Sequence, residues 1–174
     1  MTATEHVILV DEHDKEIGIA EKIQAHRDNL CHRAFSVFVF KQQPKLELLL
    51  QQRADGKYHS SGLWTNTCCS HPRPGEDILQ AGQRRLKEEM GVIVPLKSLG
   101  WFHYIAHFDN DLTENEVDHV LIGTTEIETI SPNQDEVKAY RWVTISDLEQ
   151  EITERPDLFT PWLTPALEII KKNL

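Results

Sequence analysis

Residues 76–90 constrain the fold more than any other segment, because they carry the clearest helical pattern in the chain. Ile78, Leu86 and Met90 recur near helical spacing, and Gly91 follows as a typical C-terminal stop. Runs of β-branched and apolar residues, typical of strands, lie on both sides of this segment in the sequence. Strands, a loop, a helix and further strands in this order predict a mixed β-sheet flanked by helices.

Shorter patterns predict the remaining elements. Strands are expected at residues 7–10, 17–20, 34–40, 46–53, around 63–69, 99–108, 117–125 and 137–143. The third and fourth of these runs predict a hairpin with Pro44 in its connection, and residues 55–75 predict an irregular loop. Ser146 is expected to cap one late helix, and Thr160-Pro161 to open the last one.

The composition fits one globular unit. The chain has 174 residues, of which 40% are hydrophobic, and no repeat, low-complexity tract or Gly/Ser linker divides it. Three cysteines cannot all pair, so reduced thiols are expected. We predict a single compact α/β (α+β) domain over residues 1–174.

The net charge of −10 argues against a nucleic-acid binder that uses a bulk positive field. No apolar run approaches the roughly 20 residues that a membrane span needs. The first residues also lack the pattern of a secretory signal. We therefore predict a cytoplasmic protein with neither a nucleic-acid nor a membrane partner.

The charges are unevenly distributed along the chain. Residues 22–57 hold seven basic and three acidic side chains, whereas residues 109–157 hold three basic and fourteen acidic ones. This distribution favours a compact anion bound by the basic segment, together with cations held by carboxylates. A solvated acidic surface is the alternative, which the total charge by itself favours.

The segment TNTCCSHP, residues 65–72, holds a candidate catalytic pair. If the chain is extended here, Cys69 and His71 point to the same face, because side chains alternate along a strand. One interpretation is a catalytic thiol beside a metal-bound or acid–base histidine. The other is a small buried cysteine beside a histidine on a surface loop.

The segment ENEV, residues 114–117, holds a candidate metal-binding pair. On a strand, Glu114 and Glu116 project from one face about 6.6 Å apart, a spacing that one cation can bridge. If His26, His32 and His71 converge on them, the N and O ligands would suit Zn, Mn, Fe or Mg. The alternative is a solvated acidic face with ordinary histidines elsewhere.

The helix at 76–90 also carries a recognisable motif. Aligned from Gly91, it resembles the box of the Nudix superfamily, G-x5-E-x7-R-E-U-x-E-E-x-G-U, in which U is a bulky aliphatic residue. The matching positions are Glu76, Arg84, Leu86, Glu88, Glu89, Gly91 and Val92. Ser70 replaces the first glycine of the pattern, and Arg85 replaces a glutamate. Arg85 removes a metal-binding carboxylate and adds a forked phosphate donor, which favours holding a diphosphate over cleaving it.

The box occurs together with AFSVFVF, LLLQQR, TNTCCSHP, ENE and TPW. This combination is similar to the type I isopentenyl-diphosphate isomerases, a branch of the Nudix superfamily, from HVILVDE to TPWL. The resemblance implies a Nudix-like mixed sheet. It also implies an enzyme of isoprenoid biosynthesis that interconverts isopentenyl and dimethylallyl diphosphate through a tertiary carbocation. The alternatives are a Nudix pyrophosphohydrolase and a noncatalytic metal- or phosphate-binding module.

The resemblance implies roles for individual residues. Cys69 and Glu116 match two catalytic groups on opposite sides of the substrate alkene, and Tyr104 is expected to join them. Tyr104 and Trp162 match aromatic residues that line the hydrocarbon pocket, where a π face stabilises positive charge. Which of Cys69 and Glu116 donates the proton in the forward direction stays open.

The resemblance also implies two metal sites and a diphosphate site. One Mn²⁺, Zn²⁺ or Mg²⁺ matches a set of three histidines and two glutamates, which are His26, His32, His71, Glu114 and Glu116. A Mg²⁺ bound with the diphosphate matches Glu89 and the backbone carbonyl of Cys69. The diphosphate-binding positions match Lys22, Arg53, Lys57 and Arg85. The expected partner is therefore a small-molecule diphosphate, and we expect a monomer or a weak dimer.

Overall fold

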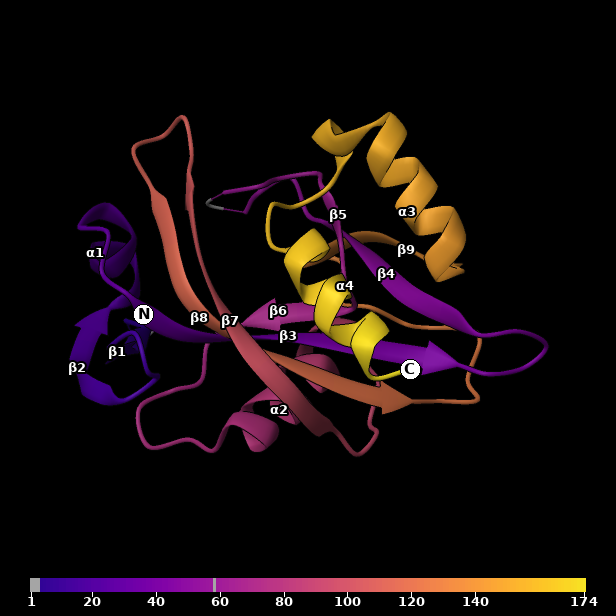
Figure 1. The fold of residues 1–174 in the computed structure, drawn as a ribbon, viewed down its shortest axis with the longest axis horizontal. Coiled ribbons are helices and arrows are strands. Elements are labelled where there is room, and N and C mark those ends of the chain that lie inside the picture. The colour runs from indigo at the N-terminus through magenta and orange to yellow at the C-terminus, as the bar shows by residue number, and fades with distance from the viewer. Residues whose placement is uncertain (1–3, 58) are drawn as a thin grey trace.

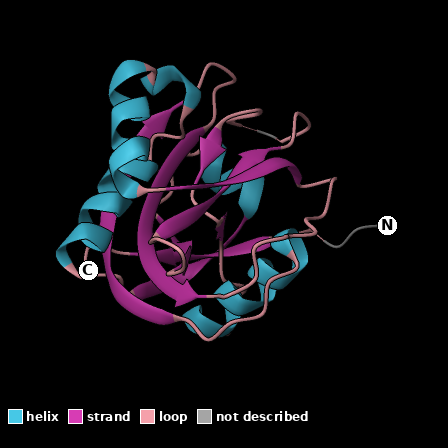
Figure 2. Cartoon of the chain, turned by 90° about the vertical axis from the view of Figure 1, so that its right-hand side faces the viewer, coloured by secondary structure: helices cyan, strands magenta, loops and turns pink. Residues whose placement is uncertain are grey.

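A mixed sheet forms the body of the protein in the computed structural model, which describes residues 4–57 and 59–174 (Figure 1). Its strands are β1 His6–Val10, β2 Glu16–Glu21, β3 His32–Lys41, β4 Glu47–Arg53, β5 Trp64–Thr65, β6 Cys68–Ser70, β7 Lys97–His107, β8 Thr113–Thr124 and β9 Val137–Val143. The helices are α1 Lys22–Arg27, α2 Ile78–Met90, α3 Ile145–Glu154, the 3-10 turn η1 Pro156–Leu158 and α4 Leu163–Lys172. Figure 2 shows helices on both sides of the sheet, so the predicted α+β class with a flanked mixed sheet is confirmed.

Strand β3 lies at the centre of this sheet. It runs parallel to β8, in a register that extends from His32 opposite Glu116 to Phe40 opposite Thr124. It runs antiparallel to β1, β4 and β6. Because β6 pairs with the middle of β3, only the last two residues of β3 pair with β4, and β4 then pairs with β9. The predicted hairpin of 34–40 and 46–53 is confirmed, although its strands separate soon after the turn.

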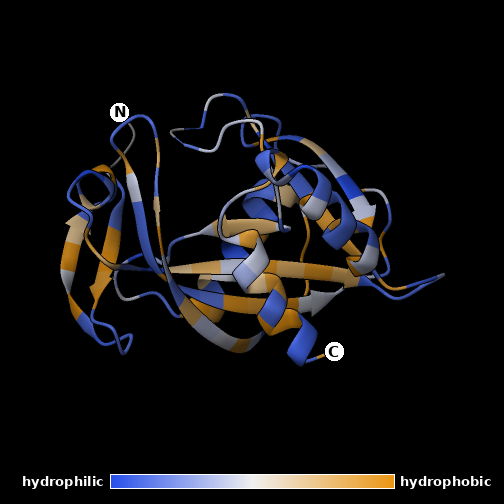
Figure 3. Cartoon of the chain, turned by 45° about the horizontal axis from the view of Figure 1, so that its top comes forward, coloured by the Kyte–Doolittle hydropathy of each residue, from blue (hydrophilic) through white to orange (hydrophobic). Residues whose placement is uncertain are grey.

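The alternation of side chains along β3 separates two layers. Val37 packs in the core that includes α2, whereas Phe38 packs in the core that includes α3 and α4. His32 and Ser36 share the face of Phe38 because they have the same parity along the strand. Figure 3 shows that the middle of the sheet is largely apolar, while many of the loops are hydrophilic. Buried polar groups therefore lie near the start of β3, on the sheet face that also carries the core with α3 and α4.

Helix α2 is close to its predicted position. It begins at Ile78, because the Asp77 carboxylate caps it by accepting backbone N–H groups at 3.0 and 3.2 Å. It ends at Met90, and Gly91 takes the predicted stop position with a φ of 69°. A Cβ on Gly91 would also lie 2.9 Å from the backbone oxygen of Ser131, so this position excludes a side chain.

The two late helices begin elsewhere than predicted. The hydroxyl of Thr144, rather than that of Ser146, caps α3 by accepting a backbone N–H at 3.1 Å. Helix α4 begins at Leu163 rather than at Thr160-Pro161. The chain just before it is extended beside β5, where Phe159 forms a parallel bridge with Trp64 and the backbone N–H of Thr160 donates to the carbonyl of Trp64 at 3.1 Å. Helix α1 is a further element that the sequence patterns did not predict. No helix in the described ranges combines the length and apolar character needed to cross a membrane.

The close approach of α2 to the sheet predicts the effect of one substitution. A Cβ on Gly82 would lie 2.7 Å from Leu121 Cδ1 and 3.0 Å from Leu96 Cδ1, and the Leu121 side chain is fully buried. Gly82→Ala is therefore expected to lower the free energy of unfolding by about 1–3 kcal/mol, despite its higher helix propensity. Gly18→Ala is the control, because its Cβ would make only an ordinary 3.8 Å contact. Urea denaturation of both variants measures the difference, and an unchanged midpoint for Gly82→Ala would contradict the prediction.

Candidate active site

Three histidines and two glutamates meet at one end of the sheet. His26 comes from α1, His32 begins β3, His71 follows β6, and Glu114 and Glu116 lie on β8. One ligand atom from each residue lies within 4.8 Å of all the others. The register places His32 beside Glu116, and the alternation of β8 places Glu114 on the same face. The structure thus brings together the five residues that were expected to bind a metal.

Backbone contacts determine which nitrogen of two histidines faces the glutamates. The Nδ1 atoms of His26 and His32 lie 2.6 Å and 2.8 Å from the carbonyl oxygens of Lys22 and Leu30. These carbonyls require an N–H at Nδ1, which leaves Nε2 as the nitrogen that faces the carboxylates. His26 Nε2 lies 2.9 Å from Glu114 Oε1, and His32 Nε2 lies 3.1 Å from Glu116 Oε2. A ring nitrogen and a carboxylate oxygen at such distances need a proton or a metal ion between them.

The electrostatics of this group favour an ionised Glu116. Burial by itself raises the pKa of Glu116, but hydrogen bonds from His32 and His71 outweigh it and hold that pKa well below its usual range. His71 Nε2 lies 2.6 Å from Glu116 Oε2, and burial lowers the pKa of His71 to about 4. The pKa of His32 is raised, because its contacts with Glu116 and Glu114 outweigh its burial. Two negative charges are thus held together in the interior by the imidazoles.

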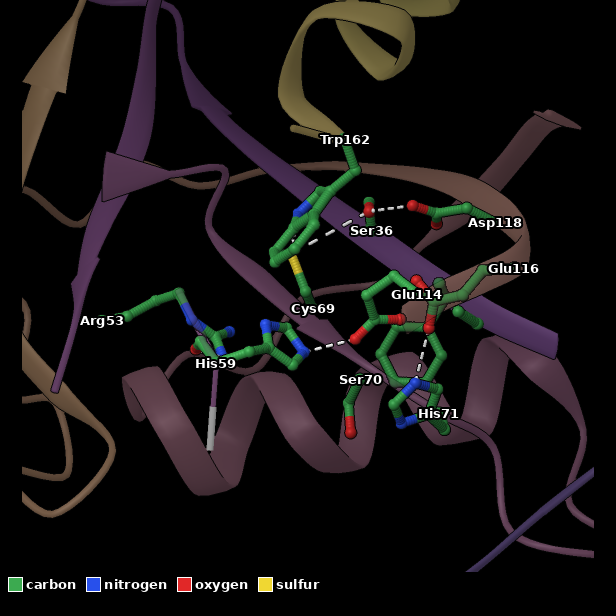
Figure 4. Close-up of a pocket in the computed structure, with 12 residues that line it drawn as sticks. Ser36, Arg53, His59, Cys69, Ser70, His71, Glu114, Glu116, Asp118 and Trp162 are labelled. Carbon is green, nitrogen blue, oxygen red and sulfur yellow. Dashed lines mark hydrogen bonds and ion pairs between the residues drawn. The ribbon is translucent and has the colours of Figure 1, made fainter. Parts of the chain in front are cut away.

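The Cys69 thiol lies in a pocket next to this metal-ligand group (Figure 4). The same pocket is lined by Glu114, Glu116 and Trp162. The Trp162 indole N–H donates to Cys69 Sγ at 2.9 Å. Burial raises the pKa of the Cys69 thiol to about 12, so the thiol keeps its proton at neutral pH.

Tyr104 and Asp118 complete the polar lining near Glu116. Tyr104 lies opposite Glu116 in the pairing of β7 with β8, and its hydroxyl donates to Glu116 Oε1. Asp118 is buried and accepts a hydrogen bond from Ser36 at 2.8 Å. Burial and the nearby Glu116 raise the pKa values of both Tyr104 and Asp118 well above their usual ranges. Both groups can therefore act as proton donors beside an ionised carboxylate.

A groove lined by cationic side chains opens beside His71. Lys22, Lys57 and Arg85 line it, together with Glu136. Lys57 forms an ion pair with Glu136, and Arg85 lies 3.5 Å from the same carboxylate. Three of the four predicted diphosphate-binding residues therefore share one groove.

The fourth residue of that set, Arg53, lies elsewhere. It lines the pocket of Cys69, where its guanidinium carbon lies 5.5 Å from the centre of the Trp162 ring. Its Nη2 donates to the carbonyl of His59 at 3.2 Å. Arg53 therefore lines the pocket of Cys69 rather than the groove.

Glu89 contacts Arg85 of the groove and is almost fully buried. Arg85 Nη2 lies 3.1 Å from its Oε2, and the Cys68 thiol donates to the same oxygen at 3.1 Å. Arg85 also lies 2.7 Å from Glu88, which is another carboxylate of the box. The arginine that replaces a box glutamate thus forms ion pairs with two of the glutamates that remain.

The sequence analysis did not single out Ser36, His59 and Asp118, which line this pocket, or Asn66, which accepts a hydrogen bond from the Cys69 thiol. His59 stacks on Phe108 at 4.7 Å, and its Nε2 contacts the Glu114 carboxylate. The other three are Ser36, Asn66 and Asp118, whose contacts are made across strands or within a loop. Asp118 could have been found from its parity with Glu114 and Glu116 on one strand. The loop around His59 has no periodicity that would have shown where its side chains point.

The family model of the NUDIX domain matches residues 31–163. Solved structures with the same fold include the MutT protein of Methanosarcina mazei, with a TM-score of 0.65 over 82% of this chain and 95% of the other at 16% identity. The MutT NUDIX hydrolase of Burkholderia pseudomallei has a TM-score of 0.63 over 80% and 98% at 18% identity. The α+β fold and the box helix are thus those of a NUDIX protein.

Relatives with higher sequence identity show to which branch of the NUDIX proteins this chain belongs. The Isopentenyl-diphosphate Delta-isomerase of Photobacterium profundum is 49% identical over 100% of this chain and 98% of its own length. The Isopentenyl-diphosphate Delta-isomerase 2 of Photorhabdus laumondii is 51% identical over 91% of this chain and 88% of its own. The chain belongs to the isopentenyl-diphosphate Delta-isomerase family of NUDIX proteins.

The ion pair of Glu76 with Arg84, called the Glu76–Arg84 clamp below, predicts how the stability of the folded protein depends on pH. Arg84 donates to Glu76 at 2.7 and 2.8 Å, and these hydrogen bonds lower the pKa of Glu76 below that of the unfolded chain. The clamp therefore stabilises the folded state above the unfolded pKa of 4.5, and this stabilisation is lost as the pH falls through the folded pKa. Glu76→Gln should flatten the fall in Tm between about pH 5 and about pH 3. Differential scanning calorimetry measures the Tm at each pH, with Glu12→Gln as the control because the Glu12 side chain is exposed. If Tm falls equally with pH in Glu76→Gln and in the native protein, the prediction is wrong.

Proposed function

We propose that this protein interconverts isopentenyl diphosphate and dimethylallyl diphosphate, as the names of its relatives indicate. The observation that carries the proposal is the pocket where the Cys69 thiol and the Glu116 carboxylate meet beside a possible metal site. An isomerase of this kind belongs to isoprenoid biosynthesis. A cytoplasmic location, a monomeric or weakly dimeric state and the absence of nucleic-acid and membrane partners stay predictions from the sequence.

The reaction moves a double bond, so it needs one proton donor and one proton acceptor at the same alkene. Because an unactivated alkene is a weak base, the carbocation that forms must be shielded from water and stabilised. Cys69 keeps its proton, whereas Glu116 is ionised and accepts a hydrogen bond from Tyr104. These contrasting states support Cys69 and Glu116 as the two catalytic groups, with Tyr104 able to exchange a proton with Glu116. The Trp162 ring supplies a π face for the positive charge.

The donor set of the buried group fits a divalent metal ion. Its three imidazoles and two carboxylates are ligands for Mn²⁺, Zn²⁺ or Mg²⁺. Glu114 Oε2 is buried and has no hydrogen-bond partner among the described residues, which supports a cation at this position. A bound ion would supply positive charge that keeps Glu116 ionised and fixes its orientation. The metal ligands of the proposal are His26, His32, His71, Glu114 and Glu116.

The groove beside His71 suits a diphosphate. Lys22, Lys57 and Arg85 supply its cationic side chains, and we assign the diphosphate of the substrate to them. Glu89 and the backbone carbonyl of Cys69 would hold a Mg²⁺ that binds with this diphosphate. Arg53, which lies against Trp162, is proposed to contact the substrate from the opposite side. The hydrocarbon would then extend toward Cys69, since that pocket adjoins His71.

The contacts of Arg85 favour isomerisation over hydrolysis of the diphosphate. NUDIX hydrolysis requires several box carboxylates to hold divalent ions that activate water. Here Arg85 takes one box position and forms ion pairs with Glu88 and Glu89. The proposal therefore predicts that the diphosphate bond of the substrate stays intact.

An assay in D₂O tests the proposed function. The protein, incubated with isopentenyl diphosphate, Mg²⁺ and Mn²⁺, should form the dimethylallyl isomer with deuterium at the exchanged positions, as measured by NMR. No inorganic phosphate should be released. Absence of both conversion and exchange by folded, metal-loaded protein would overturn the proposal, and release of phosphate would indicate a pyrophosphohydrolase.

Variants test the two catalytic groups. Cys69→Ala and Glu116→Gln should each lower kcat by about 1,000-fold or more, because each removes one proton-transfer group. Cys31→Ala is the matched control, since Cys31 is a partly exposed thiol that does not line the pocket, and it should keep the activity. Circular dichroism verifies the folding of each variant. A Cys69→Ala protein with a near-normal rate would refute the role of that thiol.

Metal binding can be tested without substrate. Isothermal titration with Mn²⁺ should detect an ion bound to the metal-free protein, and His32→Ala should weaken this binding by about 100-fold or more. His13→Ala is the control, because the side chain of His13 is 77% exposed and lies outside the ligand group. Equal affinity in the His32→Ala variant would exclude this group as the binding site.

A further inference from the structure

Asn66 lies directly behind the Cys69 thiol and is fully buried. Its amide nitrogen donates to two backbone carbonyls, that of Val37 at 3.0 Å and that of Cys68 at 2.9 Å. Both hydrogens of the amide are used by these acceptors, so the orientation of the side chain is determined by the backbone of β3 and β6. Oδ1 must therefore face the opposite direction, toward Cys69.

Asn66 Oδ1 receives two hydrogen bonds. The hydroxyl of Thr65 donates to it at 2.8 Å, and the Cys69 thiol donates to it at 3.0 Å. Because Thr65 has only one hydroxyl proton, the hydroxyl of Thr160 must be the donor in its 2.7 Å contact with Thr65. Thr65 consequently has no proton left for Cys69 Sγ, which lies 3.8 Å from it. Toward Asn66 and Thr65, the Cys69 thiol therefore acts only as a hydrogen-bond donor.

A second contact supplies the hydrogen bond that the Cys69 sulfur accepts. The Trp162 indole can only donate, and its N–H points at Cys69 Sγ from 2.9 Å. The sulfur therefore accepts from Trp162 and donates to Asn66. The Thr160–Thr65 hydrogen bond ties the segment that carries Trp162 to the segment that carries Asn66. One connected network thus sets both the position of the sulfur and the direction of its proton.

We propose that Asn66 is a positioning residue that fixes the rotamer of Cys69 and directs its S–H bond in the resting enzyme. Substrate entering the pocket then meets a thiol whose sulfur is already in place. Rotation about the Cβ–Sγ bond breaks only the hydrogen bond to Asn66 Oδ1 and turns the proton toward the substrate. Its transfer then breaks the S–H bond, forms a C–H bond at the alkene and leaves a thiolate on Cys69 and a positive charge on the substrate. The inference deepens the proposed function and rests on it for the catalytic role of Cys69. The hydrogen bond itself can be measured independently.

Infrared spectroscopy measures this hydrogen bond directly, because the S–H stretching frequency falls when a thiol donates. The difference spectrum of native protein and Cys69→Ala should contain an S–H band below the frequency of an alkanethiol in an apolar solvent. This measurement needs no substitution of Asn66. A band at the frequency of the free thiol would overturn the inference.

Substitution of Asn66 tests the consequence for catalysis. In Asn66→Ala the Cys69 band should move to higher frequency, and kcat should fall by about 100-fold while KM for the substrate changes by less than about threefold. KM is preserved because the hydrogen bonds of Asn66 join it to Thr65, Val37, Cys68 and Cys69, none of which lines the cationic groove. An unchanged kcat in a folded Asn66→Ala protein would refute the positioning role.

Thr67→Val is the matched control for loss of structure. Thr67 is also fully buried in this loop, and its hydroxyl donates to the carbonyl of Leu49 at 2.6 Å and accepts from Val39 N–H at 2.9 Å. Its substitution should lower the Tm without shifting the Cys69 band or lowering kcat by more than about threefold. A comparable shift of the band in Thr67→Val would refute the specific role of Asn66.

The two levels of the proposal fail differently. If the isomerase assignment is wrong, native protein will not convert isopentenyl diphosphate, while the lowered S–H band will still be observed. If only the role of Asn66 is wrong, native protein will convert the substrate, while Asn66→Ala will keep both the band and the rate.

Discussion

The burial of two neighbouring carboxylates, Glu114 and Glu116, is the constraint on which the arrangement of the site depends. Two like charges on one strand face, excluded from water, are tolerated only if positive or proton-bearing groups surround them. Three imidazoles and the hydroxyl of Tyr104 do this, and they come from four different elements. The N-terminal hairpin with α1, the start of β3, the end of β6 and β7 must therefore all converge on β8.

The sheet meets this requirement by dividing one of its faces. Along β3 and β8, the even-numbered side chains are polar near one end, with His32 and Glu116, and apolar farther along, with Phe38 and Val120. The apolar part packs against α3 and α4, and this burial stabilises the sheet. Trp162, just before α4, lies at the boundary between the two parts and contacts the thiol. Trp162 thus links the start of α4 to the pocket of Cys69.

Much of the fold and of the candidate site could be predicted from local patterns. The helix at 76–90 was predictable because its apolar spacing and Gly91 agree, and Glu114 and Glu116 share a face because strand alternation is strict. The start of α4 was not, because a hydrogen bond from Thr160 to a residue 96 positions away holds the preceding chain extended. His59 escaped prediction because it lies in a loop without periodicity, although it contacts Glu114. That Arg53 lines the pocket of Cys69 rather than the cationic groove likewise depends on tertiary structure, because the residues of each set lie far apart in the chain.

The sequence alone established the chemical inventory, namely the thiol, the histidines, the paired glutamates and the arginine in the box. Residue types and short spacings carry this information, because they depend only on local chain geometry. Tertiary structure alone decided which of these groups touch. His32 and Glu116 are 84 residues apart in the chain, and the parallel register of β3 with β8 brings them together. The direction of the Cys69 proton is likewise decided by backbone carbonyls of two strands acting through Asn66, and such contacts depend on how the strands pair rather than on the order of residues.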